Sequence, residues 1–141
     1  MKIWINGCFD ILHHGHFQMI RYARSLGNEL VVGIDTDERV KQLKGDNRPY
    51  HTESQRKYNL RRLKDVTKVV TFGNDEELIW HIQNEEPHTM VIGSEYKDKK
   101  IIGFDLFKNI VYFDRVNNLS TTNIISYENT RIKNSTKDLG I

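Results

Sequence analysis

Short runs of apolar residues alternate along this chain with longer segments of helical spacing. Five runs have the length and composition of strands that are buried on both faces. They lie at Lys2–Asn6, Glu29–Ile34, Lys68–Phe72, Thr89–Gly93 and Ile110–Asp114. A parallel sheet with helices on both faces produces such continuous runs, because neither face of its strands meets water.

Three segments between these runs have the pattern of amphipathic helices. Gly27 and Pro87 stand where the first and the third of them should stop. A capping box is predicted at the start of the second, which begins at Thr52. The positions that define the three patterns are Met19, Ala23 and Leu26, then Thr52, Gln55, Leu60 and Leu63, then Leu78, Ile79 and Ile82.

This alternation predicts an α/β fold, a Rossmann-like doubly wound parallel sheet of about five strands in an α/β/α sandwich. Parallel neighbours need a crossover connection, and that connection is nearly always right-handed. Ligands of such sheets bind at the carboxyl ends of the strands, where the strand order reverses. We therefore expect the chemistry in the loops after the first, fourth and fifth strands.

Length and composition fit a single globular domain of 141 residues, 38% hydrophobic and 28% charged. No apolar run approaches the eighteen or so residues that a membrane span needs. The start, MKIWINGCFD, lacks the basic and apolar regions of a secretory signal, so we expect a cytoplasmic protein. Cys8 is the single cysteine, which excludes an internal disulfide and a cysteine-based zinc site.

The net charge does not distinguish between classes of function, but the basic residues are concentrated in one part of the sequence. The net charge of +2 suits a nucleic-acid surface and a polyphosphate pocket equally well. Basic residues gather within residues 41–64, where a charge run most often forms a solvated helix face. They are Lys41, Lys44, Arg48, Arg56, Lys57, Arg61, Arg62 and Lys64.

The segment GCFDILHHGH, residues 7–16, follows the first strand and leads into the first helix. A helix N-terminus presents free N–H groups and the positive end of the helix dipole, which favours phosphate. His13 and His16 are three residues apart and can donate hydrogen bonds to phosphate oxygens on one side. Zinc binding by these histidines is a weaker alternative. Two histidines three residues apart could hold zinc, but no third ligand is apparent in the local sequence.

This segment resembles the GxFDxxHxGH signature of the cytidylyltransferase-like nucleotidyltransferase superfamily. The resemblance assigns the paired catalytic histidines to His13 and His16 and places His14 at a variable position. It implies transfer of a nucleoside monophosphate from a triphosphate to a phosphorylated small molecule, with release of pyrophosphate. Asp10 could orient the motif or approach a metal ion.

Later segments carry the resemblance further. LKGDNRP, residues 43–49, is similar to the LKGxxRP loop of heptose-phosphate adenylyltransferases, and Gln55 and Arg56 match a QR pair after it. GSEYKDKKIIG, residues 93–103, resembles the loop that follows the fourth strand in those enzymes. Ile92 stands where they often have a lysine. STTNII, residues 120–125, matches them again and has the hydroxyls of a second phosphate site at a helix start.

Arg115, five residues before STT, resembles instead the RTxGISTT of glycerol-3-phosphate cytidylyltransferases, with Val116 and Asn118 departing from that pattern. The longer set of matches favours ATP and a phosphorylated sugar or polyol. A CTP-dependent enzyme of the glycerol-3-phosphate type stays open. So does a different class, a nucleotide-binding or nucleic-acid-binding protein without catalysis on the same fold.

The resemblance implies these roles. We expect catalytic roles for His13, His16, Lys44 and Arg115. Nucleotide binding is expected of Gly7, Cys8, Phe9, Asp10, Gly15, Gly93, Ser120, Thr121 and Thr122, and substrate binding of Lys44, Arg48, Arg56 and Tyr96.

Mg²⁺ is expected to arrive with the triphosphate, with Asp10 as the one candidate protein ligand. Residues 1–129 are predicted to form the nucleotidyltransferase domain and residues 130–141 a polar tail or terminal helix. The expected partners are the nucleotide, a small phosphorylated substrate and, by resemblance, a second copy of the chain. No membrane or nucleic-acid partner is expected.

Overall fold

The computed structural model describes residues 1–114 of the chain, and an all-parallel sheet runs through them. The strands stand in the order β3-β2-β1-β4-β5. β1 pairs with β2 from Lys2↔Glu29 to Gly7↔Ile34. The strands are β1 (Lys2–Gly7), β2 (Glu29–Asp35), β3 (Lys68–Phe72), β4 (Thr89–Gly93) and β5 (Asn109–Phe113). The five predicted strands are confirmed, and their ends differ by no more than about one residue, the usual scatter of such boundaries.

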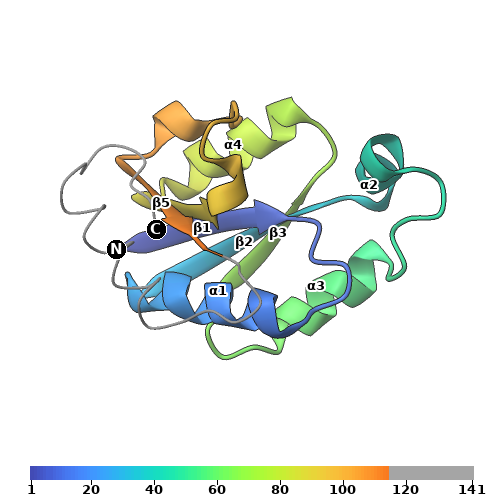
Figure 1. The fold of residues 1–141 in the computed structure, drawn as a ribbon, viewed down its shortest axis with the longest axis horizontal. Helices are drawn as coiled ribbons and strands as arrows, with labels where there is room; N and C mark the ends of the chain where they lie inside the picture. Colours follow the sequence, from blue (N-terminus) through green and yellow to red (C-terminus); the bar gives the residue numbers. More distant parts are fainter. Residues whose placement is uncertain (115–141) are drawn as a thin grey trace.

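Helices cover both faces of this sheet (Figure 1). α1 (His14–Ser25) and α3 (Glu53–Arg61) pack on one face, and α4 (Asp75–Glu85) packs on the other. α4 carries the chain from β3 back across β2 and β1 to β4, so the strand order reverses between β1 and β4. The predicted doubly wound sandwich is therefore confirmed. Within residues 1–114, no helix has both the length and the apolar character to cross a membrane.

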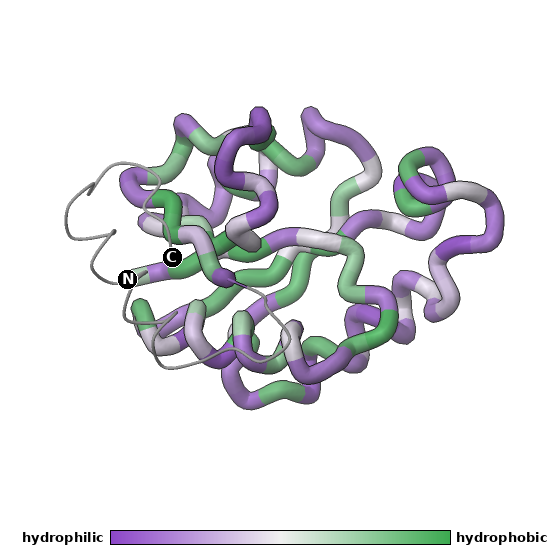
Figure 2. The backbone as a smooth tube through the Cα atoms, viewed as in Figure 1, coloured by the Kyte–Doolittle hydropathy of each residue, from purple (hydrophilic) through white to green (hydrophobic). Residues whose placement is uncertain are grey.

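The core lies along the central strands, whose chain is coloured as hydrophobic in Figure 2. Ile3, Trp4 and Ile5 of β1 are consecutive and all fully buried. Consecutive side chains of a strand point to opposite faces, so this run shows that both faces of β1 are covered. Gly33 of β2 leaves room for the indole, since a Cβ there would stand 2.8 Å from Trp4 Cζ2. A side chain at Gly33 would displace the largest residue of the core.

The helix ends follow the predicted signals with one difference. α1 ends at Ser25, two residues before Gly27. Thr52 caps α3, where its hydroxyl accepts a hydrogen bond from the Gln55 N–H. The Gln55 side chain, however, donates to Asn59 and does not return to the cap. The predicted capping box is thus half formed.

Three short elements had no counterpart in the sequence pattern. α2 (Asp37–Lys44) begins at the N-cap Thr36, and Val40 is its single buried residue. One buried position forms no stripe, so apolar spacing cannot reveal such a helix. The 3₁₀ turns η1 (Ser94–Tyr96) and η2 (Phe104–Leu106) lie in the β4–β5 connection and bury no residue. All three elements flank the carboxyl edge of the sheet or its connections.

Candidate active site

A cavity of about 560 Å³ opens where the loops after β1, β2 and β4 meet. β1 and β4 are the strands between which the strand order reverses. The cavity therefore occupies the place where a doubly wound sheet binds ligands. Its volume falls in the range of small-molecule sites.

Most of the predicted site residues within residues 1–114 meet in the wall of this cavity. They are Gly7, Cys8, Phe9, Asp10, His13, His16, Lys44, Arg48, Gly93 and Tyr96. Gly15 and Arg56 do not belong to the wall. Arg115, Ser120, Thr121 and Thr122 lie outside the described residues.

His13 and His16 together form the N-terminal cap of α1. His13 is the N-cap residue, and its Nδ1 accepts a hydrogen bond from the Gly15 N–H at 3.1 Å. His16 Nδ1 accepts from the His13 N–H at 3.2 Å. The two rings lie 3.9 Å apart between centroids. Gly15 permits this stacking, because a Cβ at that position would come within 3.1 Å of the His13 ring.

These hydrogen bonds assign the tautomer of both rings. A nitrogen that accepts an N–H bond carries no proton, so the proton of each neutral imidazole is on Nε2. Both histidines line the cavity and so bring N–H donors to the positive end of α1. His14 is exposed and is not part of the wall. At the start of α1, His13 and His16 therefore face the cavity and His14 does not.

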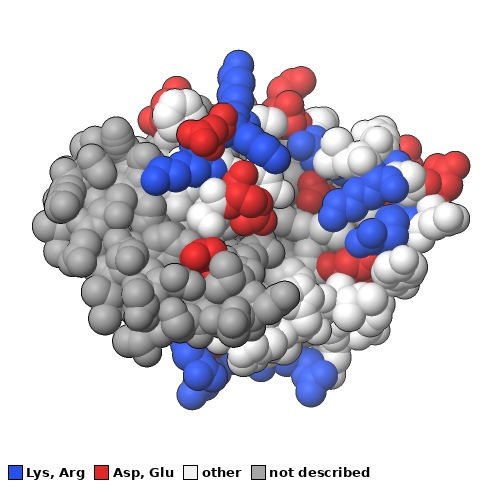
Figure 3. All heavy atoms as spheres, viewed as in Figure 1, with Lys and Arg blue, Asp and Glu red and all other residues white. Residues whose placement is uncertain are grey.

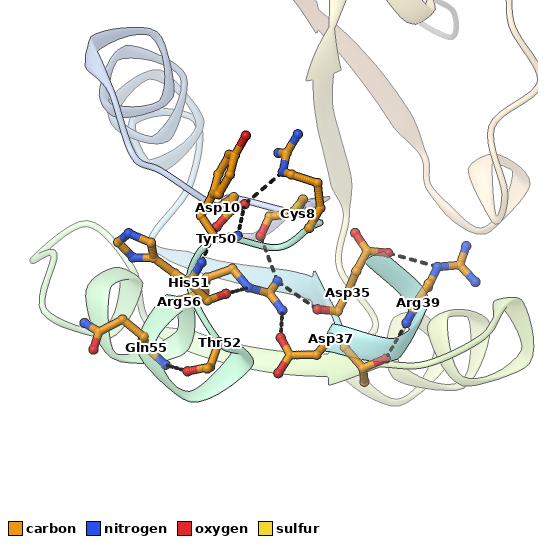
Figure 4. Close-up of polar contacts among 12 residues, drawn as sticks. Cys8, Asp10, Asp35, Asp37, Arg39, Tyr50, His51, Thr52, Gln55 and Arg56 are labelled. Carbon is orange, nitrogen blue, oxygen red and sulfur yellow. Dashed lines mark hydrogen bonds and ion pairs between the residues drawn. The ribbon is translucent and has the colours of Figure 1, made fainter. Parts of the chain in front are cut away.

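Asp10 holds the segment that follows α2 against the histidine loop (Figure 4). Its carboxylate is buried and accepts hydrogen bonds from the backbone N–H groups of Tyr50 and His51, each at 2.8 Å. Arg48 Nε donates a third at 3.3 Å. Burial by itself raises the pKa of a carboxyl, but here the three hydrogen bonds outweigh it and hold the pKa of Asp10 below its ordinary 3.8. Both carboxylate oxygens therefore accept hydrogen bonds from this segment.

Arg56 occupies a position different from the one expected of a substrate-binding residue. It lies on α3, fully buried, and its guanidinium donates only to the protein among the described residues (Figure 4). Nη1 donates to the carbonyl oxygens of Cys8 and Asp35, at 3.0 and 2.8 Å. The other partners are the His51 carbonyl oxygen, at 3.0 Å from Nε, and Asp37 Oδ1, at 2.8 Å from Nη2. Arg56 thus ties the ends of β1 and β2 to the segment before α3.

Basic side chains gather over α2 and the segment that follows it, at the right of Figure 3. Lys44 and Arg48 line the cavity there. The Arg48 guanidinium also lies 4.8 Å from the centre of the Tyr50 ring. This side of the cavity is therefore suited to a phosphate group.

The opposite wall comes from the end of β4 and the segment after it. Gly93, Tyr96, Lys100 and Ile102 line the cavity there. Tyr96 is half-exposed, and Lys99 Nζ lies 5.5 Å from the centre of its ring. Ile92, which replaces a lysine common in the resembled enzymes, is also part of the wall.

Asp35 and Arg39 are charged wall residues that lie outside every motif identified in the sequence. Asp35 is the last residue of β2, and its Oδ1 accepts a hydrogen bond from Arg39 Nε at 2.9 Å. Their spacing of four residues across the start of a helix is a signal that could have found the pair. It was hidden because α2 itself was not predicted.

The Cys8 thiol is poorly suited to nucleophilic chemistry. Burial, above all, raises the pKa of the Cys8 thiol above its ordinary 9.0, which keeps the thiol neutral and a poor nucleophile. Among residues 1–114, no group of three or more His, Cys, Asp and Glu side chains could hold a metal ion.

Comparison with known proteins gives consistent results. Residues 4–127 match the model of a family described as cytidylyltransferase-like. The chain is 42% identical over 124 residues to the bifunctional protein HldE of Campylobacter fetus subsp. fetus, which covers 88% of this chain and 27% of that protein. It is 41% identical over 136 residues to the protein of the same name from Campylobacter concisus, covering 96% and 28%. The chain spans little more than a quarter of the length of these relatives.

Among solved structures, the fold is similar to that of the lipopolysaccharide core biosynthesis protein from Thermoplasma volcanium GSS1. The TM-score is 0.67, with 83% of this chain and 98% of that chain covered, at 24% sequence identity. This likeness shows the shared fold.

Proposed function

We propose that this chain, which belongs to the cytidylyltransferase-like family, is a nucleotidyltransferase that transfers the AMP part of ATP to a phosphorylated sugar and releases pyrophosphate. The observation that carries the proposal is the histidine pair at the start of α1. Two Nε2–H donors, a helix N-terminus and a cavity meet there. This combination is suited to a polyphosphate whose charge changes during reaction.

In the proposed reaction, an oxygen of the sugar phosphate attacks the α-phosphorus of ATP in line. The bond from that phosphorus to the α,β-bridging oxygen breaks, and pyrophosphate leaves with the electron pair. No covalent enzyme intermediate is required, so catalysis consists of positioning and charge stabilisation. His13 and His16 would donate from Nε2 to oxygens of the α- and β-phosphates, where negative charge builds up.

The two sides of the cavity then have separate roles. Lys44 and Arg48 would bind the phosphate of the acceptor. Gly93 and Tyr96, with Gly7, Cys8 and Phe9 at the end of β1, would surround the nucleotide. Asp10 and Arg56 would act indirectly, because their hydrogen bonds hold the loops that carry these residues. Arg115 keeps its proposed catalytic role, and Ser120, Thr121 and Thr122 keep theirs in nucleotide binding.

Mg²⁺ would neutralise the triphosphate when bound. Oxygens of the triphosphate and water supply most of its ligands in such substrates. The engaged oxygens of Asp10 make that carboxylate better suited to holding the loop than to holding the metal. The homodimer, the cytoplasmic location and the boundary at residue 129 stay predictions.

The first experiment measures pyrophosphate release with Mg²⁺, ATP or CTP, and a panel of sugar and polyol phosphates. We expect turnover with ATP and a sugar phosphate. Turnover with CTP and glycerol 3-phosphate alone would instead support the alternative suggested by Arg115. The absence of turnover with every pair would reject the enzymatic proposal.

The histidine assignment is tested by two substitutions on one turn of the chain. His16→Asn keeps a side-chain oxygen that can accept the His13 N–H but removes the Nε2 donor. Loss of one such donor to the transition state should slow turnover by roughly 10²-fold or more. The matched control is His14→Ala, which alters an exposed residue outside the cavity wall and should leave turnover nearly unchanged. Equal rates for the two variants would contradict the assignment.

A further inference from the structure

Asp35 places a largely buried carboxylate in the cavity wall at the end of β2. Its side chain is 13% exposed. Among the described residues, the carboxylate accepts one hydrogen bond, from Arg39 Nε to Oδ1. No donor among the described residues meets Oδ2, and Oδ2 is not one of their buried atoms without a partner, so it is accessible from the cavity. A carboxylate oxygen can accept two hydrogen bonds. Oδ2 is therefore available to a ligand that brings N–H or O–H groups.

The position of Arg39 fixes the direction of this carboxylate. In Figure 4 the carbonyl group of Asp35 faces Arg56, whereas its carboxylate points the other way, toward Arg39. Arg39 is itself anchored, because Nη2 donates to Asp75 Oδ1 at 2.9 Å and the guanidinium lies 5.4 Å from the centre of the Phe72 ring. A carboxylate held in this way is preorganised for a ligand.

The charge around Asp35 indicates which donors would suit it. Arg39 and Lys44 line the same part of the cavity, so a cationic ligand group would meet two positive charges. A second phosphate would meet the negative charge of Asp35. Neutral hydroxyl groups avoid both penalties. Burial, more than any other factor, raises the pKa of Asp35 even with Arg39 beside it, which is consistent with a carboxylate short of donors.

The place of Asp35 in the fold indicates which part of the substrates would carry those hydroxyls. Asp35 ends β2, and Lys44 ends the helix that follows it. In the proposed function the nucleotide is surrounded by the ends of β1 and β4 and the segment beyond β4, and Asp35 on β2 lies on the other side of β1 from β4. Hydroxyls that reach Asp35 therefore belong to the molecule whose phosphate meets Lys44 and Arg48.

We propose that Asp35, oriented by Arg39, is a specificity residue that accepts hydrogen bonds from neighbouring hydroxyl groups of the phosphorylated acceptor. This inference rests on the proposed function for the identity of the acceptor. It predicts that the enzyme selects acceptors by their hydroxyl groups as well as by their phosphate. A site with a buried hydrogen-bonding group discriminates strongly against an analogue that lacks its partner, because the group is then left unpaired.

The test pairs changes in the protein with changes in the acceptor. Glucose 1-phosphate, mannose 1-phosphate and their monodeoxy analogues are compared as acceptors for wild-type protein and for Asp35→Ala and Asp35→Asn. In wild-type protein, removal of the hydroxyl that Asp35 accepts should lower kcat/KM by about 10- to 100-fold. In Asp35→Ala the same removal should change kcat/KM less than about 3-fold, as a double-mutant cycle requires. Asp35→Asn should lie between them.

Asp75→Ala is the matched control. It removes the other ion pair of Arg39 and lies outside the cavity wall. If Asp35 acted only through the position of Arg39, the two alanine variants would lose the same selectivity. We expect Asp75→Ala to keep the wild-type preference among deoxy analogues. Thermal unfolding of each variant shows that the comparison is made on folded protein.

ATP and its 2′-deoxy and 3′-deoxy analogues form the second arm. The KM of ATP should stay within about 2-fold in Asp35→Ala, as expected of a group that contributes no hydrogen bond to the nucleotide. Selectivity among the ATP analogues that depended on Asp35 would overturn the proposal and assign the carboxylate to the ribose. Unchanged selectivity among the sugar phosphates in Asp35→Ala would also overturn it.

Calorimetric binding of the same sugar phosphates without ATP separates this inference from the proposed function. Binding that depends on both Asp35 and one hydroxyl, without pyrophosphate release in any reaction, would support the inference and reject the enzymatic proposal. Turnover without any effect of Asp35 on hydroxyl selectivity would do the reverse. Neither binding nor turnover would reject both.

Discussion

Buried charged side chains stand at both ends of the sheet, and the partners that satisfy them differ between the two ends. At the carboxyl end, Arg56 and Asp10 bond mainly to backbone groups of the loops around the cavity. At the amino end, Glu85 of α4 bonds to the side chains of Lys2 and Lys68, at 3.0 and 2.6 Å. One end therefore fixes loops, whereas the other joins strands to a helix.

The difference teaches what a buried charge can do for a site. A backbone partner cannot move without its loop, so a charge that bonds to several backbone groups determines the shape of the cavity. A lysine partner is a flexible side chain with access to water, and Lys68 is 53% exposed. It can neutralise Glu85 without fixing any other atom. Substitutions at the carboxyl end should thus affect both folding and turnover, and those at the amino end folding alone.

Arg56→Met should have the largest effect. Methionine has a similar length but leaves the carbonyl oxygens of Cys8, Asp35 and His51 without their donor and Asp37 without its ion pair. Loss of one partner from a buried charged network costs about 3–5 kcal/mol. We expect the free energy of unfolding, measured by denaturant titration, to fall by that amount, with loss of turnover. Arg61→Met, on the exposed side of the same helix, is the control and should cost less than about 0.5 kcal/mol.

A smaller loss for Arg56→Met, close to that of the control, would remove the distinction between the two ends. It would mean that the loops keep their positions without the guanidinium.

Asp10→Asn should have an intermediate effect. The variant keeps the shape of the side chain but turns one acceptor into a donor that faces an N–H group of Tyr50 or His51. A hydrogen bond to a charged group contributes about 1.5–3 kcal/mol, and we expect a loss of that size in the free energy of unfolding. Turnover should fall as well, because the loop that carries Arg48 loses its anchor.

The dependence of stability on pH tests whether the charge of Asp10 is responsible for this loss. The folded pKa of Asp10 lies below the ordinary 3.8, so its contribution is present above about pH 4 and is lost as pH falls through the folded pKa. Wild-type protein and Asp10→Asn should therefore differ at neutral pH and become alike in strong acid. A difference that stayed constant through the acid range would show that the carboxylate charge plays no part.

The strands could be predicted from the sequence because a strand that is buried on both faces is a continuous run of apolar residues. Ile3, Trp4 and Ile5 form such a run, and Val69 and Val70 begin another. The histidine pair could also be predicted, because its motif lies between a predicted strand and a predicted helix, the structural context that such a motif requires. Both signals depend on residues that are neighbours in the sequence, and the sequence alone is therefore enough to predict them.

The roles of individual charges could not be predicted in the same way. Arg56 and Arg61 belong to the same basic stretch of the sequence, yet one is fully buried and the other exposed. The partners of Arg56 are as far as 48 positions away along the chain, at Cys8. Asp35 shows the same limit, because its place in the cavity depends on how β2 and α2 meet. Such roles depend on contacts between distant segments.

Glu85→Gln should have the smallest effect, and it tests the amino end directly. Its ion pairs have partly exposed lysines, so we expect a loss of about 1 kcal/mol or less in the free energy of unfolding. Burial raises the pKa of Glu85, but hydrogen bonds from Lys68 and Lys2 outweigh it and hold the pKa below its ordinary 4.5. The loss should thus be full above about pH 5 and vanish as pH falls through the folded pKa.

Turnover decides what Glu85→Gln says about the two ends. Glu85 lies on the helix surface that faces Lys2 and Lys68, at the amino end of β1 and β3, and is not part of the cavity wall. Because its partners hold no loop, kcat and KM should stay within about 2-fold of wild type. A larger change would mean that strain at the amino end reaches the cavity through the rigid strands. The ends of the sheet would then be coupled rather than independent, and the contrast between backbone and side-chain partners would lose its functional meaning.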